Sequence, residues 1–360
     1  MGQTHVTKEN YHGWSNTYRL SNGWLEAHVV TDIGPRIIDL RLPGGANLLQ
    51  IREGLGGRGE ATYVFRGGWR LWIAPERTET TYALDNAACQ AAVVGKATLR
   101  VAAPPQPAAG IQKRIEVSLA PGEPRLRLVS HITNIADRPL TCAAWSVPVM
   151  QPGGRAFVPL DVGPPTAFDA TRRLILWSYA KFADRRYQFG DRLIQIDSGN
   201  VRPPPPAPSG TVDQCEDVLR EPQHERSQSP SNKGFSAHPE LVEGSFQRKS
   251  TDSSGRAEDE SKIGVDSAQG WAAYLLGGAL FLKRFPHAAG QYPDGGATIE
   301  VYSNHGILEL EHLGPLTTIA PGEEIVFPED WWVFSGAHVP ATEVEALAAL
   351  QGYIARAPFP

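Results

Sequence analysis

Apolar and polar residues alternate in short runs along most of the chain, and clusters of turn-forming residues such as SNG, APGEP, NIADRP, YPDGG and APGEE separate the runs. Alternation with a period of two is typical of strands that bury one face, and many short strands joined by turns are typical of a sandwich. The pattern therefore predicts an all-β protein, a large antiparallel β-sandwich. The clearest runs are WLEAHVV (24–30), RIIDLRL (36–42), KATLRVA (96–102), IQKRIEVSL (111–119), RLRLVSHITN (125–134), RLILWSY (173–179), RLIQID (192–197), WAAYLL (271–276), ALFLKRF (279–285), ATIEVYS (297–303) and ILELEHL (307–313).

One segment near the C-terminus has helical spacing instead. Val344, Leu347, Leu350 and Ile354 recur at intervals of three and four residues after the sequence ATE. This spacing places apolar side chains on one face of a helix. We therefore expect a short C-terminal helix that packs on the outside of the sandwich.

The composition changes abruptly in residues 198–262. This segment contains VRPPPPAPSG, QHERSQSPSNK and STDSSGRAEDESK, and its only aromatic residues are Phe235 and Phe246. Such a composition buries too little apolar surface to offset the entropy lost on ordering. The sequence predicts a disordered insertion, either passive or used for docking, within a single sandwich domain formed by residues 1–197 and 263–360.

The charge balance narrows the possible partners. The chain has 34 basic and 39 acidic residues and a formal net charge of −5, so it lacks the basic excess that binds nucleic acid. The cysteines Cys89, Cys142 and Cys215 have no spacing typical of a disulfide framework or a zinc site. We find no apolar stretch of membrane-spanning length, so the sequence predicts a soluble, cytoplasmic protein without a membrane partner.

The run ATIEVYSNHGILELEHL reads as a hairpin closed by SNHG. Only an even number of loop residues places its apolar residues on one face. The register we predict sets Glu300 opposite Glu309, places Glu311 two residues along the same face and sets Tyr302 beside Ile307. The apolar residues on the other face are Ile299, Val301, Leu308 and Leu310.

Three carboxylates on one strand face have three possible interpretations. On an exposed face they are the polar half of an amphipathic strand. In a cleft, crowding raises at least one pKa, which suits a general acid or base or the binding of sugar hydroxyls. A metal site formed by Glu309, Glu311 and His305 is the third interpretation, but no recognised metal-ligand spacing supports it, so we expect no metal and no cofactor.

Motifs in this chain resemble those of the galactose mutarotase-like (aldose 1-epimerase) superfamily. LELEH followed by TTIAPGEE is similar to its last strands, NIADRPLTCAAWSVPVM to its turn and strand in mid-chain, and VTDIGPRIIDLRLPGGANLL to its opening hairpin. GGWRLWIAPE, KIG, YPDGG and LELEHLGPL, in this order, resemble a domain-of-unknown-function branch. The resemblance implies a carbohydrate ligand in a concave cleft and gives Glu309 the position of the catalytic base.

The chain departs from that pattern at one position. Aligning Asn134, Asp137 and Pro139 with the turn of the superfamily places Val147 where a histidine acid is expected. A valine cannot protonate the ring oxygen of a sugar, so mutarotation needs another acid.

Several side chains are candidates for the remaining roles. Lys283 is a cation inside a β run and is predicted to be catalytic beside Glu309, although an ordinary ion pair explains it equally well. The histidines His28 and His131 are more typical of structural imidazoles than of catalytic ones. Arginine and carboxylate groups bind hydroxyls, and tryptophan stacks on sugar rings or packs in cores. The predicted substrate-binding residues are Arg36, Arg70, Trp72, Trp145, Glu300 and Glu311.

The sequence thus supports two functional hypotheses. The first is binding of a monosaccharide or sugar derivative, with mutarotase-like acid–base chemistry. The alternative is a non-catalytic carbohydrate-binding or sensing module. An acid facing Glu309 would distinguish them.

Overall fold

The computed structural model describes residues 4–52, 60–61, 63–95, 97–164, 168, 170–198, 260–304 and 306–359. Within these residues the strands form an 11-stranded first sheet and a 10-stranded second sheet, both antiparallel. In spatial order the first sheet contains β1 (His5–Tyr11), β2 (Trp14–Ser21), β3 (Glu26–Val30), β4 (Arg36–Arg41), β5 (Trp69–Ala74), β10 (Leu140–Met150), β19 (Leu308–Leu313), β18 (Ile299–Ser303), β15 (Ser261–Asp266) and β12 (Arg173–Leu176), and β20 (Thr317–Ile319) pairs with β10.

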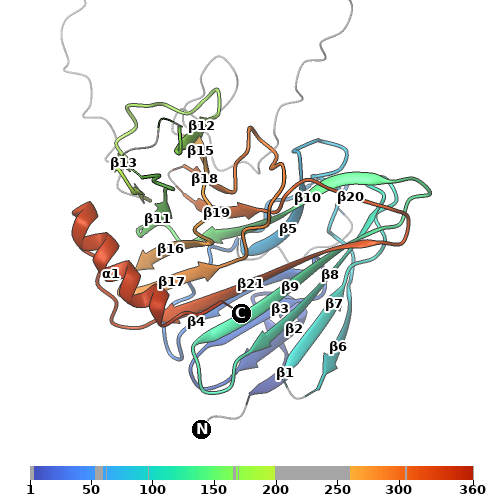
Figure 1. Ribbon diagram of the computed structural model, residues 1–360. Coiled ribbons are helices and arrows are strands. Elements are labelled where there is room, and N and C mark those ends of the chain that lie inside the picture. Colours follow the sequence, from blue (N-terminus) through green and yellow to red (C-terminus); the bar gives the residue numbers. More distant parts are fainter. Residues whose placement is uncertain are drawn as a thin grey trace, which may run out of the picture.

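The second sheet packs against the first (Figure 1). Its spatial order places the last strand of the chain in the middle, between strands from the two halves of the sequence. The strands are β13 (Tyr187–Phe189), β14 (Leu193–Asp197), β11 (Arg155–Pro159), β16 (Trp271–Leu276), β17 (Ala279–Arg284), β21 (Glu324–Phe334), β9 (Arg125–Asn134), β8 (Ile111–Leu119), β7 (Thr98–Ala102) and β6 (Gln90–Val94).

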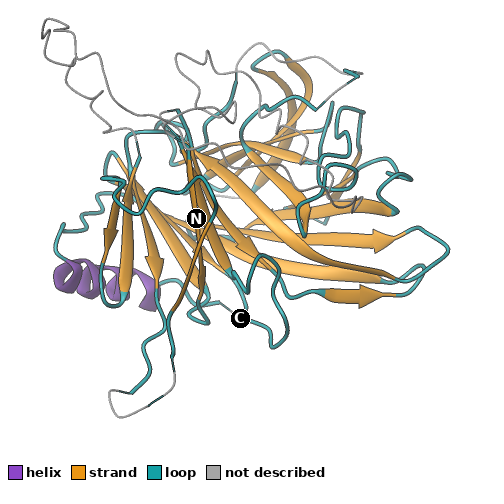
Figure 2. Ribbon diagram, turned by 90° about the horizontal axis from the view of Figure 1, so that it is seen from above, coloured by secondary structure: helices purple, strands orange, loops and turns teal. Residues whose placement is uncertain are grey.

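The main core lies between the two sheets. Alternate residues of facing strands fill it, for example Leu308 and Leu310 from β19 and Phe281 from β17. Because side chains alternate along a strand, Glu309 and Glu311 lie on the other face of the first sheet, which we call the site face. The predicted all-β sandwich is confirmed, and strands are the main regular secondary structure of the described residues (Figure 2).

The predicted C-terminal helix is α1 (Glu343–Ala355). It packs outside the second sheet, next to β16 and β17 (Figure 1), where Leu350 joins a cluster with Trp332 and Phe334. The predicted apolar face is only partly right, because Val344 is 79% exposed. The adjacent Trp331 points the opposite way from Trp332, into the main core.

The hairpin β18–β19 has the predicted face but not the predicted register. Glu300 pairs with Glu311, and Tyr302 pairs with Glu309, so the register differs by two residues. The cause is the turn: the Asn304 side chain accepts hydrogen bonds from the backbone N–H groups of Gly306 and Ile307, at 2.8 and 3.1 Å. The last pair of the hairpin is Ser303 with Leu308 instead of Tyr302 with Ile307, so the loop keeps four residues and the apolar face is unchanged.

The predicted insertion, residues 198–262, lies outside the described residues except at its two ends. Ser198 hydrogen bonds to the backbone of Gly154, and Ser261 and Lys262 are the first two residues of β15. Lys262 therefore belongs to the first sheet, and the segment predicted as the insertion is too long at its C-terminal end. The start of β15 was not recognised as a strand, because low-complexity sequence precedes it and its partner, β18, lies further along the chain.

Candidate functional site

The centre of the site face is an ion pair that crosses strand β10. Nη1 of Arg70, on β5, donates a hydrogen bond to Oε1 of Glu309, on β19, at 3.0 Å. The Arg70 guanidinium lies over the Trp72 ring, with Cζ 3.9 Å from the ring centroid. Glu309 is only 3% exposed, so both charges are taken out of water. Taking two charges out of water costs free energy, and only their mutual attraction and their hydrogen bonds offset that cost.

Val147 lies on β10 directly beside Arg70 in the register, and Val149 lies beside Glu309. The strand between the two charges is therefore apolar on this face, and the Arg70 side chain spans it. The resemblance assigns a histidine acid to position 147. The structure places that position next to the ion pair, but the valine there has no proton to give.

A second group of charges lies beside the first. Nζ of Lys262, on β15, is 2.8 Å from Oε2 of Glu300 and 3.2 Å from Oε2 of Glu311. The same oxygen of Glu311 accepts a hydrogen bond from Nε1 of Trp145 at 2.7 Å. The ammonium lies between two indole rings, 4.5 Å from the centroid of Trp145 and 4.8 Å from that of Trp177. Lys262 thus connects two carboxylates under aromatic cover.

Burial changes the protonation behaviour of these groups. It raises the pKa of Glu300 well above the usual value, and the carboxylates of Glu311 and Asp294 add to this while Lys262 opposes it. Burial and the Glu311 charge also raise the pKa of Glu309, against the effect of Arg70. Burial lowers the pKa of Lys262, but the two glutamates outweigh it and the net shift is upward.

Asp294, in the turn before β18, lies close enough to Glu300 for each carboxyl group to affect the pKa of the other. Two neighbouring carboxylates repel each other, which favours the protonated form of one of them. Burial raises the pKa of Asp294 as well, so the pair holds a proton to a higher pH than an isolated carboxyl group. The site face therefore carries two neighbouring carboxyl groups with raised pKa values beside Glu309.

Some polar atoms of this site remain available. Among the described residues, Oε1 of Glu300, Oε1 of Glu311 and the hydroxyl of Tyr63 have no hydrogen-bond partner, although each is buried. Buried polar atoms are normally satisfied by protein, water or ligand. Their arrangement on one face suits a small ligand with several hydroxyl groups.

The structure brings together most of the residues that the sequence predicted. Arg36 lies on β4 beside Arg70 in the register, but its guanidinium is occupied by the backbone oxygen of Gly67 at 2.7 Å and by Oδ2 of Asp85 at 2.6 Å. Arg36 therefore holds the loops of Gly67 and Asp85 in place at the edge of the site. The predicted residues that share the centre of the site face are Arg70, Trp72, Trp145, Glu300, Glu309 and Glu311.

Lys283 does not join this group, and the predicted pairing with Glu309 is wrong. Its Nζ lies between the sheets, 3.0 Å from Oγ of Ser146 and 3.4 Å from Oε2 of Glu329. Glu329 also accepts a hydrogen bond from Trp331 at 2.7 Å. Since β17 belongs to the second sheet, its inward side chains meet the back of the site strands. Sequence alternation alone could not identify which sheet β17 joins.

The histidines lie away from the centre. His28 stacks on Tyr11, with ring centroids 3.9 Å apart, and its Nε2 lies 3.0 Å from Glu9. His131 pairs with Glu324 on the second sheet. His305 lies outside the described residues, so the proposed metal set with Glu309 and Glu311 cannot be placed there. Among the residues that are described, no group of three or more histidine, cysteine or acidic side chains could hold a metal ion.

Sequence reasoning missed Lys262 and Asp294 as site residues. Both lie in motifs that support the resemblance, KIG and YPDGG. Lys262 was assigned to the insertion, because polar low-complexity sequence precedes it directly. The alternation of Lys262 with Ile263 and Val265 was the available signal for a strand.

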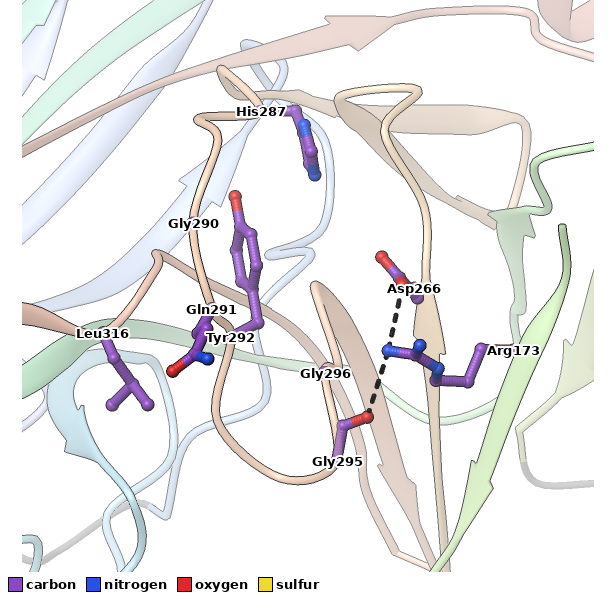
Figure 3. A pocket seen from close by; sticks show the side chains of 9 residues that line it. All are labelled: Arg173, Asp266, His287, Gly290, Gln291, Tyr292, Gly295, Gly296 and Leu316. Carbon is purple, nitrogen blue, oxygen red and sulfur yellow. Dashed lines mark hydrogen bonds and ion pairs between the residues drawn. The ribbon is translucent and has the colours of Figure 1, made fainter.

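An open cavity of about 420 Å³ adjoins the buried site (Figure 3). Tyr292 and Leu316 line it and also pack against the apolar cluster that contains Trp72 and Trp145. Asp294 lies in the turn between Tyr292 and the glycines that close the cavity. The loop that lines this open cavity therefore also packs against the buried site. Its lining residues are Arg173, Asp266, His287, Gly290, Gln291, Tyr292, Gly295, Gly296 and Leu316.

Comparison with known proteins places the fold. No protein-family model matches the chain, and no curated protein matches it in sequence. A candidate aldose 1-epimerase from Klebsiella pneumoniae has a similar structure, with a TM-score of 0.52 and 11% identity over 94% of this chain and 82% of that protein. A candidate mutarotase from Salmonella typhimurium has a TM-score of 0.51 and 7% identity over 92% and 94%. The chain therefore has the galactose mutarotase-like fold.

The described residues contain no helix with the length and apolar character needed to cross a membrane.

Proposed function

We propose that this protein binds a monosaccharide or sugar derivative at the site face and interconverts its anomers, with Glu309 as the general base. Three observations support the proposal: the mutarotase-like fold, the buried Arg70–Glu309 pair over Trp72, and the neighbouring carboxyl groups of Asp294 and Glu300, whose pKa values are raised. The last carries the most weight, because it supplies the acid that Val147 cannot.

The proposed reaction needs two proton transfers. Glu309 removes the proton of the anomeric hydroxyl group, and its raised pKa makes it a stronger base than an exposed glutamate. As a carbonyl group forms at the anomeric carbon, the bond from that carbon to the ring oxygen breaks, and the ring oxygen takes a proton from the Asp294–Glu300 pair. Rotation about the exposed carbon–carbon bond and the reverse steps give the other anomer and return both protons.

Arg70 has a positioning role in this scheme. Its guanidinium fixes the Glu309 carboxylate at 3.0 Å and stacks on Trp72. A planar fork held against an aromatic ring loses little freedom when a ligand binds. Glu311, held by Trp145 and Lys262, retains one oxygen that can accept a hydrogen bond from a sugar hydroxyl group.

The second candidate function is a carbohydrate-binding module without catalysis. Val147 at the position of the usual acid favours it, because a valine beside Arg70 offers no proton. The two candidates differ only in whether bound sugar exchanges anomers faster than it does in buffer.

The test starts with a thermal-shift screen against free sugars and sugar phosphates, since a ligand that binds the native state raises its apparent stability. Each sugar that binds is then examined by NMR for anomer exchange. We expect exchange above the buffer rate for wild type, loss of exchange in Glu309→Gln, and a normal rate in Glu324→Gln, a matched glutamate on the second sheet.

Val147→His restores the usual acid and is expected to raise the exchange rate. If wild type, Glu309→Gln and Val147→His all match the buffer rate on every sugar that binds, the catalytic proposal is wrong and the binding module replaces it. If no sugar raises the apparent stability, both candidates fail.

A further inference from the structure

The cavity beside the site has two chemically different walls. On one wall, Nη1 of Arg173 lies 3.3 Å from Oδ2 of Asp266, and both side chains remain accessible, at 58% and 39%. On the other wall, the rings of His287 and Tyr292 stack, with centroids 5.4 Å apart and an angle of 14° between them. Figure 3 shows the charged pair facing the loop that carries the rings. The cavity thus combines an aromatic surface with adjacent donor and acceptor groups.

A glycine turn holds the charged wall in place. A Cβ atom at Gly296 would lie 2.4 Å from Nη1 of Arg173, so a side chain there would displace the guanidinium. The φ angle of Gly296 is +99°, a conformation that other residues rarely adopt. Nη1 of Arg173 also donates a hydrogen bond to the backbone oxygen of Gly295 at 3.4 Å. The guanidinium is therefore fixed across the cavity by two partners.

The charge of the cavity selects its ligand. Asp266 neutralises Arg173, and the other lining side chains with polar groups are Gln291, Tyr292 and His287. A phosphate or carboxylate ligand would need an excess of positive charge, which this cavity lacks. Paired donor and acceptor groups facing an aromatic surface suit neighbouring hydroxyl groups on a neutral ring.

Two lining residues connect the cavity to the buried site. Tyr292 packs against the cluster of Trp72 and Trp145, whose rings contact Arg70 and Lys262. Two residues after Tyr292, Asp294 lies close enough to Glu300 for their carboxyl groups to interact electrostatically. The loop that carries Tyr292 and Asp294 therefore borders both the cavity and the buried carboxyl groups.

We propose that the cavity is a second sugar subsite, so that the ligand is a neutral reducing disaccharide with its non-reducing ring in the cavity and its reducing ring at Glu309. This inference rests on the proposed function of the site face, which it deepens by naming the substrate class. Arg173 and Asp266 bind the hydroxyl groups of the outer ring, and the faces of His287 and Tyr292 pack against its apolar side.

Titration calorimetry with neutral monosaccharides and with disaccharides built from them tests the proposal. We expect disaccharides to bind wild type more tightly than their component monosaccharides. Arg173→Ala and His287→Ala should weaken disaccharide binding about tenfold each, the effect of a lost hydrogen bond to a charged group or a lost stacking surface. Both variants should bind monosaccharides as wild type does.

The matched control is Arg172→Ala. Arg172 is the neighbouring exposed arginine, whose guanidinium donates to the backbone oxygen of Asp191 outside the cavity, at 2.9 Å. It should bind every sugar as wild type does. Equal weakening in the Arg172 and Arg173 variants would overturn the subsite, as would disaccharides that bind no tighter than monosaccharides.

Further outcomes separate this inference from the proposed function. If monosaccharides bind and require Glu309 but Arg173→Ala has no effect on any disaccharide, only the second subsite is wrong. If disaccharides bind and require Arg173 but Glu309→Gln changes neither their affinity nor their anomer exchange, the cavity stands and the proposed chemistry fails. If no neutral sugar binds, both are wrong.

Discussion

Lys262 is the residue on which the charge balance of the buried site depends. It lies within 3.2 Å of both Glu300 and Glu311. Removing one partner of a buried ion pair leaves an uncompensated charge, which typically costs about 3 to 5 kcal/mol. We expect Lys262→Met to lower the free energy of unfolding by about that amount, measured by urea denaturation at pH 7.

The double variant Lys262→Met with Glu300→Gln is the control for this effect. Replacing the carboxyl group removes one of the charges that Lys262 compensates, so the second substitution should recover a large part of the lost stability. Additive effects of the two substitutions would contradict the pairing, because residues in contact should show a coupling energy.

The raised pKa of Glu300 makes stability depend on pH. Between the ordinary value of 4.5 and the raised value, the folded protein binds more protons than the unfolded chain. Stability therefore falls as pH rises above 4.5 through that window. We expect Glu300→Gln to make the dependence less steep, measured as the urea midpoint from pH 4.5 to 8. An unchanged slope would mean that Glu300 titrates normally.

Lys283 has the opposite effect on the pH dependence of stability. Burial lowers its pKa from 10.5 to about 8, although Glu329 opposes the shift, so between these values the unfolded chain binds more protons than the folded protein. Stability contributed by this residue therefore rises with pH from about 8 to 10.5. Comparing wild type with Lys283→Met over this range should show that the variant lacks the rise. A rise of equal size in both proteins would exclude Lys283 as its source.

At the level of elements, the hairpin β18–β19 places apolar and acidic residues on opposite faces. Leu308 and Leu310 are fully buried in the main core. We expect Leu308→Ala and Leu310→Ala each to cost about 2 to 5 kcal/mol, measured by urea denaturation. Val326→Ala on β21, where the side chain is 53% exposed, should change stability by less than about 0.5 kcal/mol. If both leucine substitutions left the free energy of unfolding unchanged, the assignment of faces would be contradicted.

At the scale of the whole molecule, the boundary at Lys262 determines which part of the chain can be replaced. We expect a Gly/Ser linker in place of residues 199–259 to leave the melting temperature within a few degrees, since added loop length changes the free energy only slightly. The matched control extends the replacement to residue 262, which removes Ser261 and Lys262 from β15. That protein should be much less stable. Loss of soluble protein with the shorter replacement would show that the segment belongs to the fold.

Local patterns determined the elements of this protein. Period-two alternation identified strands such as β8 and β19, and helical spacing identified α1. The parity of the hairpin followed from the same rule, because only an even loop buries Leu308 and Leu310 together. Each of these inferences depends on residues close in sequence, which is why they required no knowledge of the tertiary structure.

The exact register required the turn itself. A shift of two residues keeps every side chain on its face, so alternation cannot distinguish the pairing of Glu300 with Glu309 from the observed pairing with Glu311. The hydrogen bonds of the Asn304 side chain decide between them.

The tertiary structure decided which side chains meet at the site. Glu309 was assigned from a sequence resemblance, but its neighbours come from β5, β10, β15 and β18, which are far apart in the chain. Lys283 and Lys262 show the consequence: one lies between the sheets and the other holds two carboxylates on the site face. Both are lysines inside strands, and nothing local distinguishes them. Which sheet a strand joins depends on pairing between distant segments, and that pairing determines which charges meet.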